Sequence, residues 1–158
     1  MALPEQTLIE LGKRSMRFRR LAAELLLACN IKGCSKRMKN RWETAAGTLA
    51  YTAMVLPHMP RPHASLVPLR SRKPLSALTL LEVADDVEAA ALEQMYGTVN
   101  RQILRAAADS LRKVARRMMP KTYDGPLETE PYRLWSEAKR ARELVLSRAK
   151  STRRRKRQ

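Results

Sequence analysis

Five of the nine prolines fall between positions 57 and 74, in the stretch PHMPRPHASLVPLRSRKP. Proline lacks a backbone N–H and clashes with the preceding turn of a helix, so neither a helix nor a sheet ladder runs easily through this stretch. We therefore predict an extended connector at 57–74. Because the connector exceeds the roughly 12–15 residues usual for an unstructured loop, we expect it to lie along another surface.

Two amphipathic helices are expected before the connector. The first runs from about Pro4 to Ala28, and the turn that follows has Gly33 as its natural turning residue. Ser35 is the expected N-cap of the second helix, which ends before Pro57. The apolar seam of this second helix comprises Met38, Trp42, Ala45, Leu49 and Leu56.

Three further helices are expected after the connector. Ser76 is the predicted N-cap of one that runs to about Tyr96 and stops at Gly97. The next spans Thr98 to Met119 and ends at Pro120. Its seam comprises Ile103, Ala107, Leu111, Val114 and Met118.

The last helix is expected to start near Glu130, after a turn at 123–126, and to end in a basic tail at 151–158 that is disordered or ordered by a partner. Its seam comprises Leu134, Ala138, Ala141 and Val145. With only five glycines and few β-branched clusters, the chain is predicted to be all-α. We expect a bundle of about five helices as one domain at 1–150, followed by the tail, and no apolar run is long enough to span a bilayer.

The charge of the chain points to a polyanionic partner. Lys and Arg number 32 against 15 acids, which gives a formal net charge of +17. A free monomer of this charge repels itself, and nucleic acid relieves that repulsion. Arginines outnumber lysines 22 to 10, and the planar guanidinium suits bidentate phosphate contacts.

The cations are concentrated at both ends of the chain, at the start of the second helix and along one face of the fourth helix. We expect this face of the fourth helix to be exposed to solvent. The strongest signal is the run of five cations in the tail, RRRKR. The candidate nucleic-acid-binding residues are Lys13, Arg17, Arg20, Lys36, Arg37, Lys39, Arg41, Arg70, Arg72, Lys73, Arg101, Arg105, Arg112, Arg116, Arg153, Arg154, Arg155, Lys156 and Arg157.

The segment 79–96 contains no cation but five acids. One interpretation is an intramolecular clamp that pairs these acids with arginines of the first or fourth helix. The other is a surface turned toward a neighbouring protein, with Glu82, Asp86 and Glu93 as its contacts. In neither interpretation does this helix touch phosphate.

The sequence offers little for catalysis or metal binding. Cys29 and Cys34 followed by His58 and His63 have a zinc-finger look, but a helix over most of the intervening residues separates the pairs by roughly 30 Å. No Ser-His-acid or Cys-His arrangement and no phosphate-cradling glycine motif is present. We therefore expect neither an enzyme nor a cofactor or metal site.

These traits predict a non-catalytic RNA-binding subunit of a ribonucleoprotein. Aromatic residues are only 4% of the chain, which favours phosphate and shape contacts to folded RNA or a duplex over base stacking on a single strand. The chain is similar in type to lineage-specific proteins of mitochondrial ribosomes, which implies rRNA and neighbouring ribosomal proteins as partners. The first 28 residues are amphipathic and basic like a mitochondrial presequence, although Glu5, Glu10 and Glu24 are not typical of one. We expect a mitochondrial matrix location, with a bacterial cytoplasm or a nucleus as alternatives.

Two alternative functions stay open on sequence grounds. The first two helices and the turn between them could form a helix-turn-helix in a DNA-binding regulator or packaging protein. The basic faces could also lie on anionic lipid in an accessory subunit of a membrane-associated complex.

Overall fold

The computed structural model describes residues 3–56, 75–93 and 97–157, and it is helical throughout these ranges apart from turns. The predicted all-α class is confirmed, and no strand occurs among the described residues. The expected connector at 57–74 lies outside them. The helices are α1 (Glu5–Ala28), α2 (Lys36–Val55), α3 (Ala77–Leu92), α4 (Gly97–Met118) and α5 (Thr129–Lys156).

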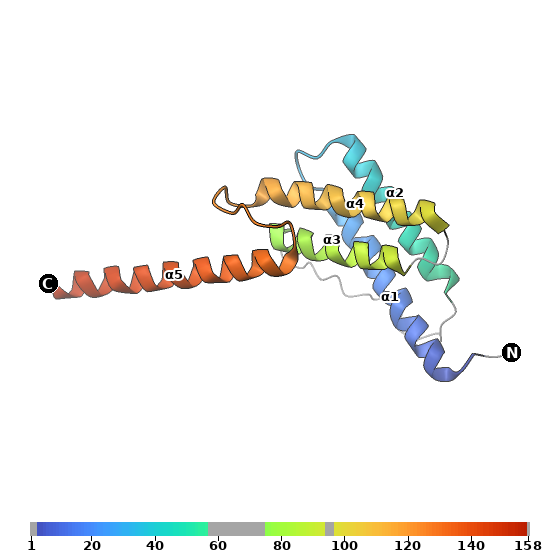
Figure 1. Cartoon of the computed structure of the whole chain (residues 1–158), viewed down its shortest axis with the longest axis horizontal. Coiled ribbons are helices and arrows are strands. Elements are labelled where there is room, and N and C mark those ends of the chain that lie inside the picture. The colour runs from blue at the N-terminus through green and yellow to red at the C-terminus, as the bar shows by residue number, and fades with distance from the viewer. Residues whose placement is uncertain (1–2, 57–74, 94–96, 158) are drawn as a thin grey trace.

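The first four helices form a packed body from which α5 projects (Figure 1). Within the body, α1 packs along α2, α3 packs along α4, and α2 also contacts α4. Among the helices described, α5 touches only α3. The molecule therefore has two parts with different environments: a body of helices α1 to α4, and a helix that leaves it.

Two of the helix starts are fixed by serine caps, as the sequence predicts. The Ser35 hydroxyl accepts the N–H of Met38 at 3.2 Å, and the Ser76 hydroxyl accepts the N–H of Thr79 at the same distance. Each hydroxyl satisfies an N–H that has no partner inside its helix. Gly33, the predicted turn residue, has a φ of 83°, in the left-handed region that favours glycine.

The predicted end of the third helix is wrong. Helix α3 stops at Leu92 with Glu93 as its C-cap, and Gly97 is the first residue of α4 instead of a helix stop. The last turn of α3 closes through the Glu93 N–H, which bonds the carbonyls of Ala90 and Ala91. A tightened final turn of this kind ends a helix without glycine.

The core lies where α4 is enclosed by α2 and α3. Leu104 and Ala108 are completely buried on α4 although neither belongs to the predicted seam, whereas Met118, which does, is 43% exposed. A seam read at helical spacing describes burial on one side, and α4 packs against two neighbours, so its buried face is wider. The largest side chains in the core, each less than 2% exposed, are Trp42, Phe18, Leu21, Leu25, Leu49, Leu80, Leu81, Leu104, Leu111, Val83 and Val87.

Helix α5 departs from the sequence-based prediction in two ways. Its expected seam faces solvent: Leu134 and Val145 are 57% and 67% exposed, and Ala138 and Ala141 are exposed too. The helix also does not end before residue 151 but continues to Lys156. The tail contains neither Gly nor Pro, arginine and lysine are good helix formers, and cations are stabilising near a helix C-terminus, so local sequence supports this extension.

Candidate nucleic-acid interface

Three aromatic side chains anchor the start of α5 to the turn that precedes it. The Tyr123 ring lies 5.1 Å from both the Tyr132 and Trp135 rings, measured between centroids, and the latter two rings are 6.0 Å apart. Tyr123 is buried, and its hydroxyl donates to the Pro126 carbonyl at 2.5 Å. Burial raises the pKa of Tyr123 above its ordinary value.

A glycine is required beneath this aromatic cluster. A Cβ at Gly125 would lie 2.7 Å from the Tyr123 hydroxyl and 2.8 Å from the adjacent ring carbon. Any side chain there would push the Tyr123 ring away from its partners. The turn is further held by Arg116, which donates to the carbonyls of Tyr123 at 3.1 Å and Gly125 at 3.3 Å.

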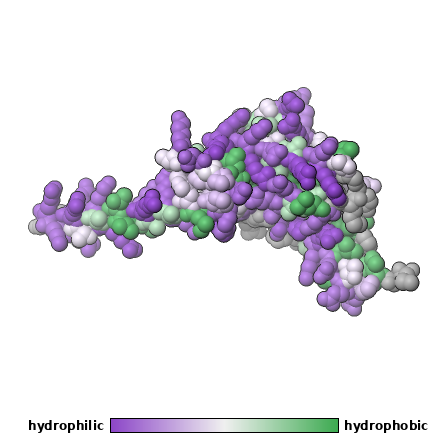
Figure 2. All heavy atoms as spheres, in the orientation of Figure 1, coloured by the Kyte–Doolittle hydropathy of each residue, from purple (hydrophilic) through white to green (hydrophobic). Residues whose placement is uncertain are grey.

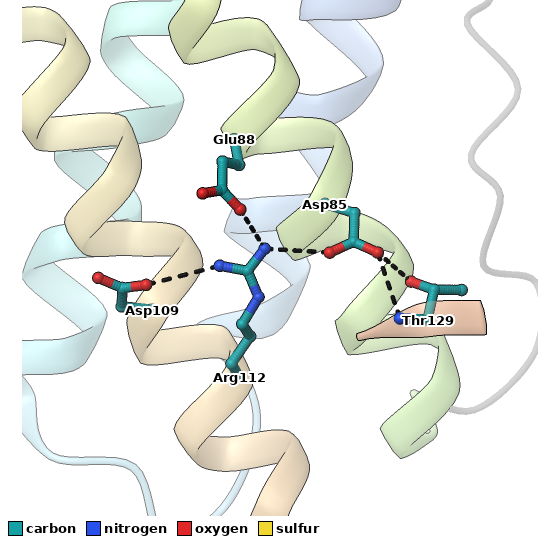
Figure 3. Close-up of polar contacts among 5 residues, drawn as sticks. All are labelled: Asp85, Glu88, Asp109, Arg112 and Thr129. Carbon is teal, nitrogen blue, oxygen red and sulfur yellow. Dashed lines mark hydrogen bonds and ion pairs between the residues drawn. The ribbon is translucent and has the colours of Figure 1, made fainter. Parts of the chain in front are cut away.

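The first residue of α5 is capped by a carboxylate from another helix. Asp85 of α3 accepts the backbone N–H of Thr129 at 3.3 Å and also the Thr129 hydroxyl (Figure 3). The N-cap residue Glu128 makes no side-chain cap of its own, so Asp85 satisfies an N–H at the start of α5 that its own helix leaves free. This contact fixes where α5 leaves the body.

Arg112 of α4 joins the same network from the other side. Its guanidinium contacts Asp85 at 3.0 Å, Glu88 at shorter range and Asp109 at 3.5 Å (Figure 3). The Arg112 side chain is 15% exposed, so its predicted position on the solvent side of α4 is wrong. Its N–H groups are occupied by carboxylates, because α3 lies directly against this face of α4.

The protonation of Arg112 follows from these contacts. Burial by itself lowers the pKa of Arg112, but its hydrogen bonds to Asp85 and Glu88 outweigh burial and leave the pKa above its ordinary value. These contacts thus favour the charged form of the Arg112 guanidinium.

A second ion-pair group joins α3 to α1. Glu93 contacts Arg17, and its carboxylate also lies 3.5 Å from the Nε of Arg14. Arg17 was predicted to bind phosphate and Glu93 to bind a protein partner, yet the two pair with each other. Asp85, Glu88 and Glu93 thus form the intramolecular clamp with arginines of α1 and α4. Contacts of Glu82 and Asp86 with a partner protein stay a prediction.

The remaining predicted cations of the body lie on several separate surfaces. Lys13, Arg101 and Arg105 are exposed, Arg20 is half-buried, and Arg116 holds the turn before α5. Lys36 and Arg37 are exposed at the start of α2, where Lys39 and Arg41 are half-buried. Arg70, Arg72 and Lys73 fall in the connector, outside the described residues. Of these side chains, the structure brings Lys36, Arg37 and Arg41 together, beside α4.

The largest concentration of exposed charge is on distal α5, by which we mean residues 137–157. It contains ten lysines and arginines against two acids, Glu137 and Glu143, and every one of its residues is exposed. None of its cations forms an ion pair with a described residue. The predicted tail cations Arg153 to Arg157 therefore belong to a longer helical surface.

Three cations of distal α5 are aligned along one side of the helix. Lys150, Arg154 and Arg157 follow one another at four- and three-residue spacing, which places them above one another along the helix. Together with Arg153 and two serines they surround a shallow surface hollow of about 640 Å³. Guanidinium donors beside hydroxyls suit phosphate oxygens.

A hydrophobic band interrupts this charge. Leu144, Val145 and Leu146 are 60%, 67% and 61% exposed, and Figure 2 shows hydrophobic surface in the projecting helix between stretches of hydrophilic side chains. Sequence periodicity assigned Val145 to a packed seam because spacing does not show whether a partner helix exists. The many charged residues around Val145 were the one feature of the sequence that indicated its exposure, and no described helix covers it.

The cysteines and the hydropathy of the helices add nothing to the candidate interface. Cys29 and Cys34 are free thiols, and burial raises the pKa of Cys29. His58 and His63 lie outside the described residues, and no metal-binding cluster of three or more ligands occurs in the described part of the chain. No described helix is both long and apolar enough to cross a membrane.

Comparisons with known proteins give no relative: no family model, no curated protein and no solved structure matches this chain.

Proposed function

We propose that this protein is a non-catalytic RNA-binding subunit of a ribonucleoprotein and that distal α5 is its principal RNA contact. The observation that carries the proposal is a fully exposed helix with ten cations and no ion-pair partner in the described chain. Such a helix buries no apolar surface to stabilise it, and its like charges repel one another. A polyanion supplies both the missing contacts and the neutralising charge.

The mechanism is electrostatic. Each cation that neutralises a phosphate releases condensed counterions, which makes binding favourable and steeply dependent on salt. A helix of 28 residues spans about 42 Å, so α5 can follow several successive phosphates. Its cations lie on more than one side, which suits a folded RNA that approaches the helix from two directions.

Folded RNA or a duplex is favoured over single-stranded nucleic acid, because few of the large aromatic side chains are exposed. The large aromatic side chains Phe18, Trp42, Tyr123 and Tyr132 are buried, so base stacking contributes little and phosphate and shape contacts dominate. The proposed assembly is a ribosome or ribosome precursor. An organelle is the proposed location because the chain is similar in type to lineage-specific proteins of mitochondrial ribosomes. Co-sedimentation of the tagged chain with ribosomal subunits tests that narrower assignment.

The decisive experiment compares two variants of equal net charge. One changes Arg153, Arg154, Arg155 and Arg157 to Gln, which removes charge but keeps helix propensity. The other changes four exposed cations of the body or its adjoining turns, and these are Lys32, Lys113, Arg117 and Lys121. Binding of an RNA hairpin, the same sequence as duplex DNA, and phosphatidylserine-containing vesicles is measured by fluorescence anisotropy across a salt series.

We expect the α5 variant to lose about two to four units of salt slope and roughly a hundredfold or more in RNA affinity at about 0.1 M salt. The body variant should lose less than about threefold. Equal losses would mean that net charge, not α5, drives binding. Tighter binding to duplex DNA would favour the DNA-binding alternative, and tighter binding to vesicles would assign distal α5 and its Leu144–Leu146 band to a membrane surface.

A further inference from the structure

A groove lies between the first half of α2 and the first half of α4, well away from distal α5. Its volume is about 650 Å³, and it is open to solvent. Its lining comprises three apolar residues of α4, which we call the floor, three cations of α2, which we call the rim, and three neutral polar residues; these are Val99, Ile103 and Ala106, Lys36, Arg37 and Arg41, and Asn40, Thr44 and Gln102. No acidic residue lines it. We call this feature the α2/α4 groove.

The floor of the groove is apolar surface that the body leaves uncovered. Val99 is 67% exposed, while Ile103 and Ala106 are half-buried and therefore still accessible. These three residues are spaced by four and three along α4, so they form one stripe about 10 Å long, or two helical turns. A stripe of this spacing accommodates the apolar face of another helix.

The rim of the groove is positioned before any partner arrives. Arg41 donates through Nη1 to the Ser110 hydroxyl at 3.4 Å, which holds its guanidinium beside α4. Lys36 and Arg37 lie in the first turn of α2, where backbone N–H groups without helical partners add to the positive potential. A carboxylate on a bound partner would meet both the cations and these N–H groups.

From this arrangement we infer that the α2/α4 groove docks a short amphipathic helix of a partner protein, with two or three apolar residues on one face and Asp or Glu beside them. Charge complementarity to a rim of three cations without an acid selects the acidic flank. An extended peptide would gain less, because the groove is formed by two helices and offers no free strand edge to pair with its backbone.

Other occupants fit the groove less well. RNA phosphates would use the rim, but the aliphatic floor has no aromatic ring on which a base could stack. The connector at 57–74 contains Arg61, Arg70, Arg72 and Lys73 and no acid, so its charge has the wrong sign. The acidic helix of a second copy is α3, and its apolar side is already packed in the core through residues such as Leu80 and Val87.

The test uses the full-length protein and a synthetic helix-stapled peptide of about 14 residues, long enough for the two turns of the floor. The peptide has Leu at successive i, i+4 and i+7 positions and Glu beside them, and a fluorescent label reports binding. Two control peptides replace every Glu by Lys or every Leu by Ser. The protein variants are Lys36→Glu with Arg37→Glu, and separately Val99→Ser.

Acidic residues in the first turn of α2 favour the helix dipole, and Val99 is largely exposed, so these variants keep the fold. We expect each to weaken binding of the Glu peptide by about tenfold or more. The matched reversal Lys113→Glu with Arg117→Glu, at exposed positions outside the groove, should change it by less than about twofold. The Lys peptide should bind the Lys36→Glu, Arg37→Glu protein better than it binds the unchanged protein.

Absence of that charge-swapped binding, equal binding of the Ser peptide, or no binding of the Glu peptide at about 1 mM would overturn the inference. A further arm adds the RNA hairpin to the variant that lacks Arg153, Arg154, Arg155 and Arg157. If RNA then displaces the peptide and Val99→Ser weakens the binding of RNA, the groove is an RNA site and the inference fails. Because peptide binding does not require distal α5, failure of the RNA proposal would leave this result unaffected.

Discussion

The body and distal α5 carry their arginines in opposite ways. In the body, Arg112 bridges three acids and Arg17 contacts Glu93, so the charge joins helices to one another. In distal α5, Arg148 and Arg153 to Arg157 are exposed and meet no acid among the described residues. The same residue type thus stabilises the fold in one region and is left available for a partner in the other. Net charge alone does not distinguish these two uses.

We expect the body and distal α5 to differ most in the rate at which their backbone amides exchange hydrogen. Backbone amides of distal α5 are protected only by a solvated helix, whereas those of α3 and α4 are protected by a packed core. We expect amides in 137–157 to exchange at least about a thousandfold faster than those around Leu111 in the free protein. Saturating RNA hairpin should slow exchange in distal α5 and leave α4 unchanged. Core-like protection of free distal α5 would contradict the division into two regions.

A matched pair of leucine substitutions gives the next largest difference. Leu111 is completely buried on α4, while Leu144 is 60% exposed on α5. Leu111→Ala should lower the free energy of unfolding by about 3 kcal/mol or more, through lost burial and the cavity left behind. Leu144→Ala should change it by less than about 0.5 kcal/mol. Urea denaturation followed by circular dichroism measures both, and a large effect of Leu144→Ala would show that α5 packs on the body after all.

Substitution of Arg112 tests how the two regions are joined. Arg112→Met keeps the aliphatic stem but leaves Asp85 and Glu88 without their cation, so we expect a loss of about 1–2 kcal/mol in unfolding free energy. Asp85 should then hold the Thr129 N–H less firmly, and the first turn of α5 should exchange faster. Asp109→Asn, which removes only the longest of the three contacts, serves as the milder control. Equal stability of Arg112→Met and the unchanged protein would rule out the clamp as a stabilising contact.

The smallest expected effect concerns alkaline pH. The pKa of Tyr123 is raised in the folded state, so its contribution to stability is complete below its ordinary pKa near 10 and is lost as pH rises through the higher folded value. Tyr123→Phe should remove this dependence and cost about 1 kcal/mol at neutral pH, because the hydrogen bond to Pro126 is lost. Thermal unfolding between about pH 9 and 11, compared for the two proteins, isolates Tyr123 from the lysines that titrate in the same range. Parallel pH profiles would show that the hydroxyl is not linked to folding.

Features fixed by neighbouring residues were predictable from the sequence. The caps Ser35 and Ser76, the turn at Gly33 and the starts of all five helices depend on residues within one turn, and the structure places each start within a residue or two of its expected position. The exception is Gly97, which was predicted to end α3 but begins α4. Glycine is permitted at both ends of a helix, and which end it occupies here depends on where α3 stops.

Features that depend on which helices become neighbours were not predictable. The pairing of Arg112 with Asp85 and the capping of Thr129 by Asp85 join positions far apart in the chain. Periodicity gave α5 a seam at Leu134 and Val145 with the same helical spacing as the seam of α4, but no helix among the described residues covers these two side chains. The candidate interface could be predicted as a basic tail, but not its extent, because exposure is a property of the assembled helices.

Distal α5 also bears on the lifetime of the protein. Its lysines and arginines are cleavage sites for proteases that cut after basic residues, and they lie in a helix that can fray without unfolding the body. A free copy would therefore lose distal α5 first, and a copy bound to a partner through distal α5 would keep it shielded. We therefore expect the amount of intact chain in a cell to follow the amount of that partner.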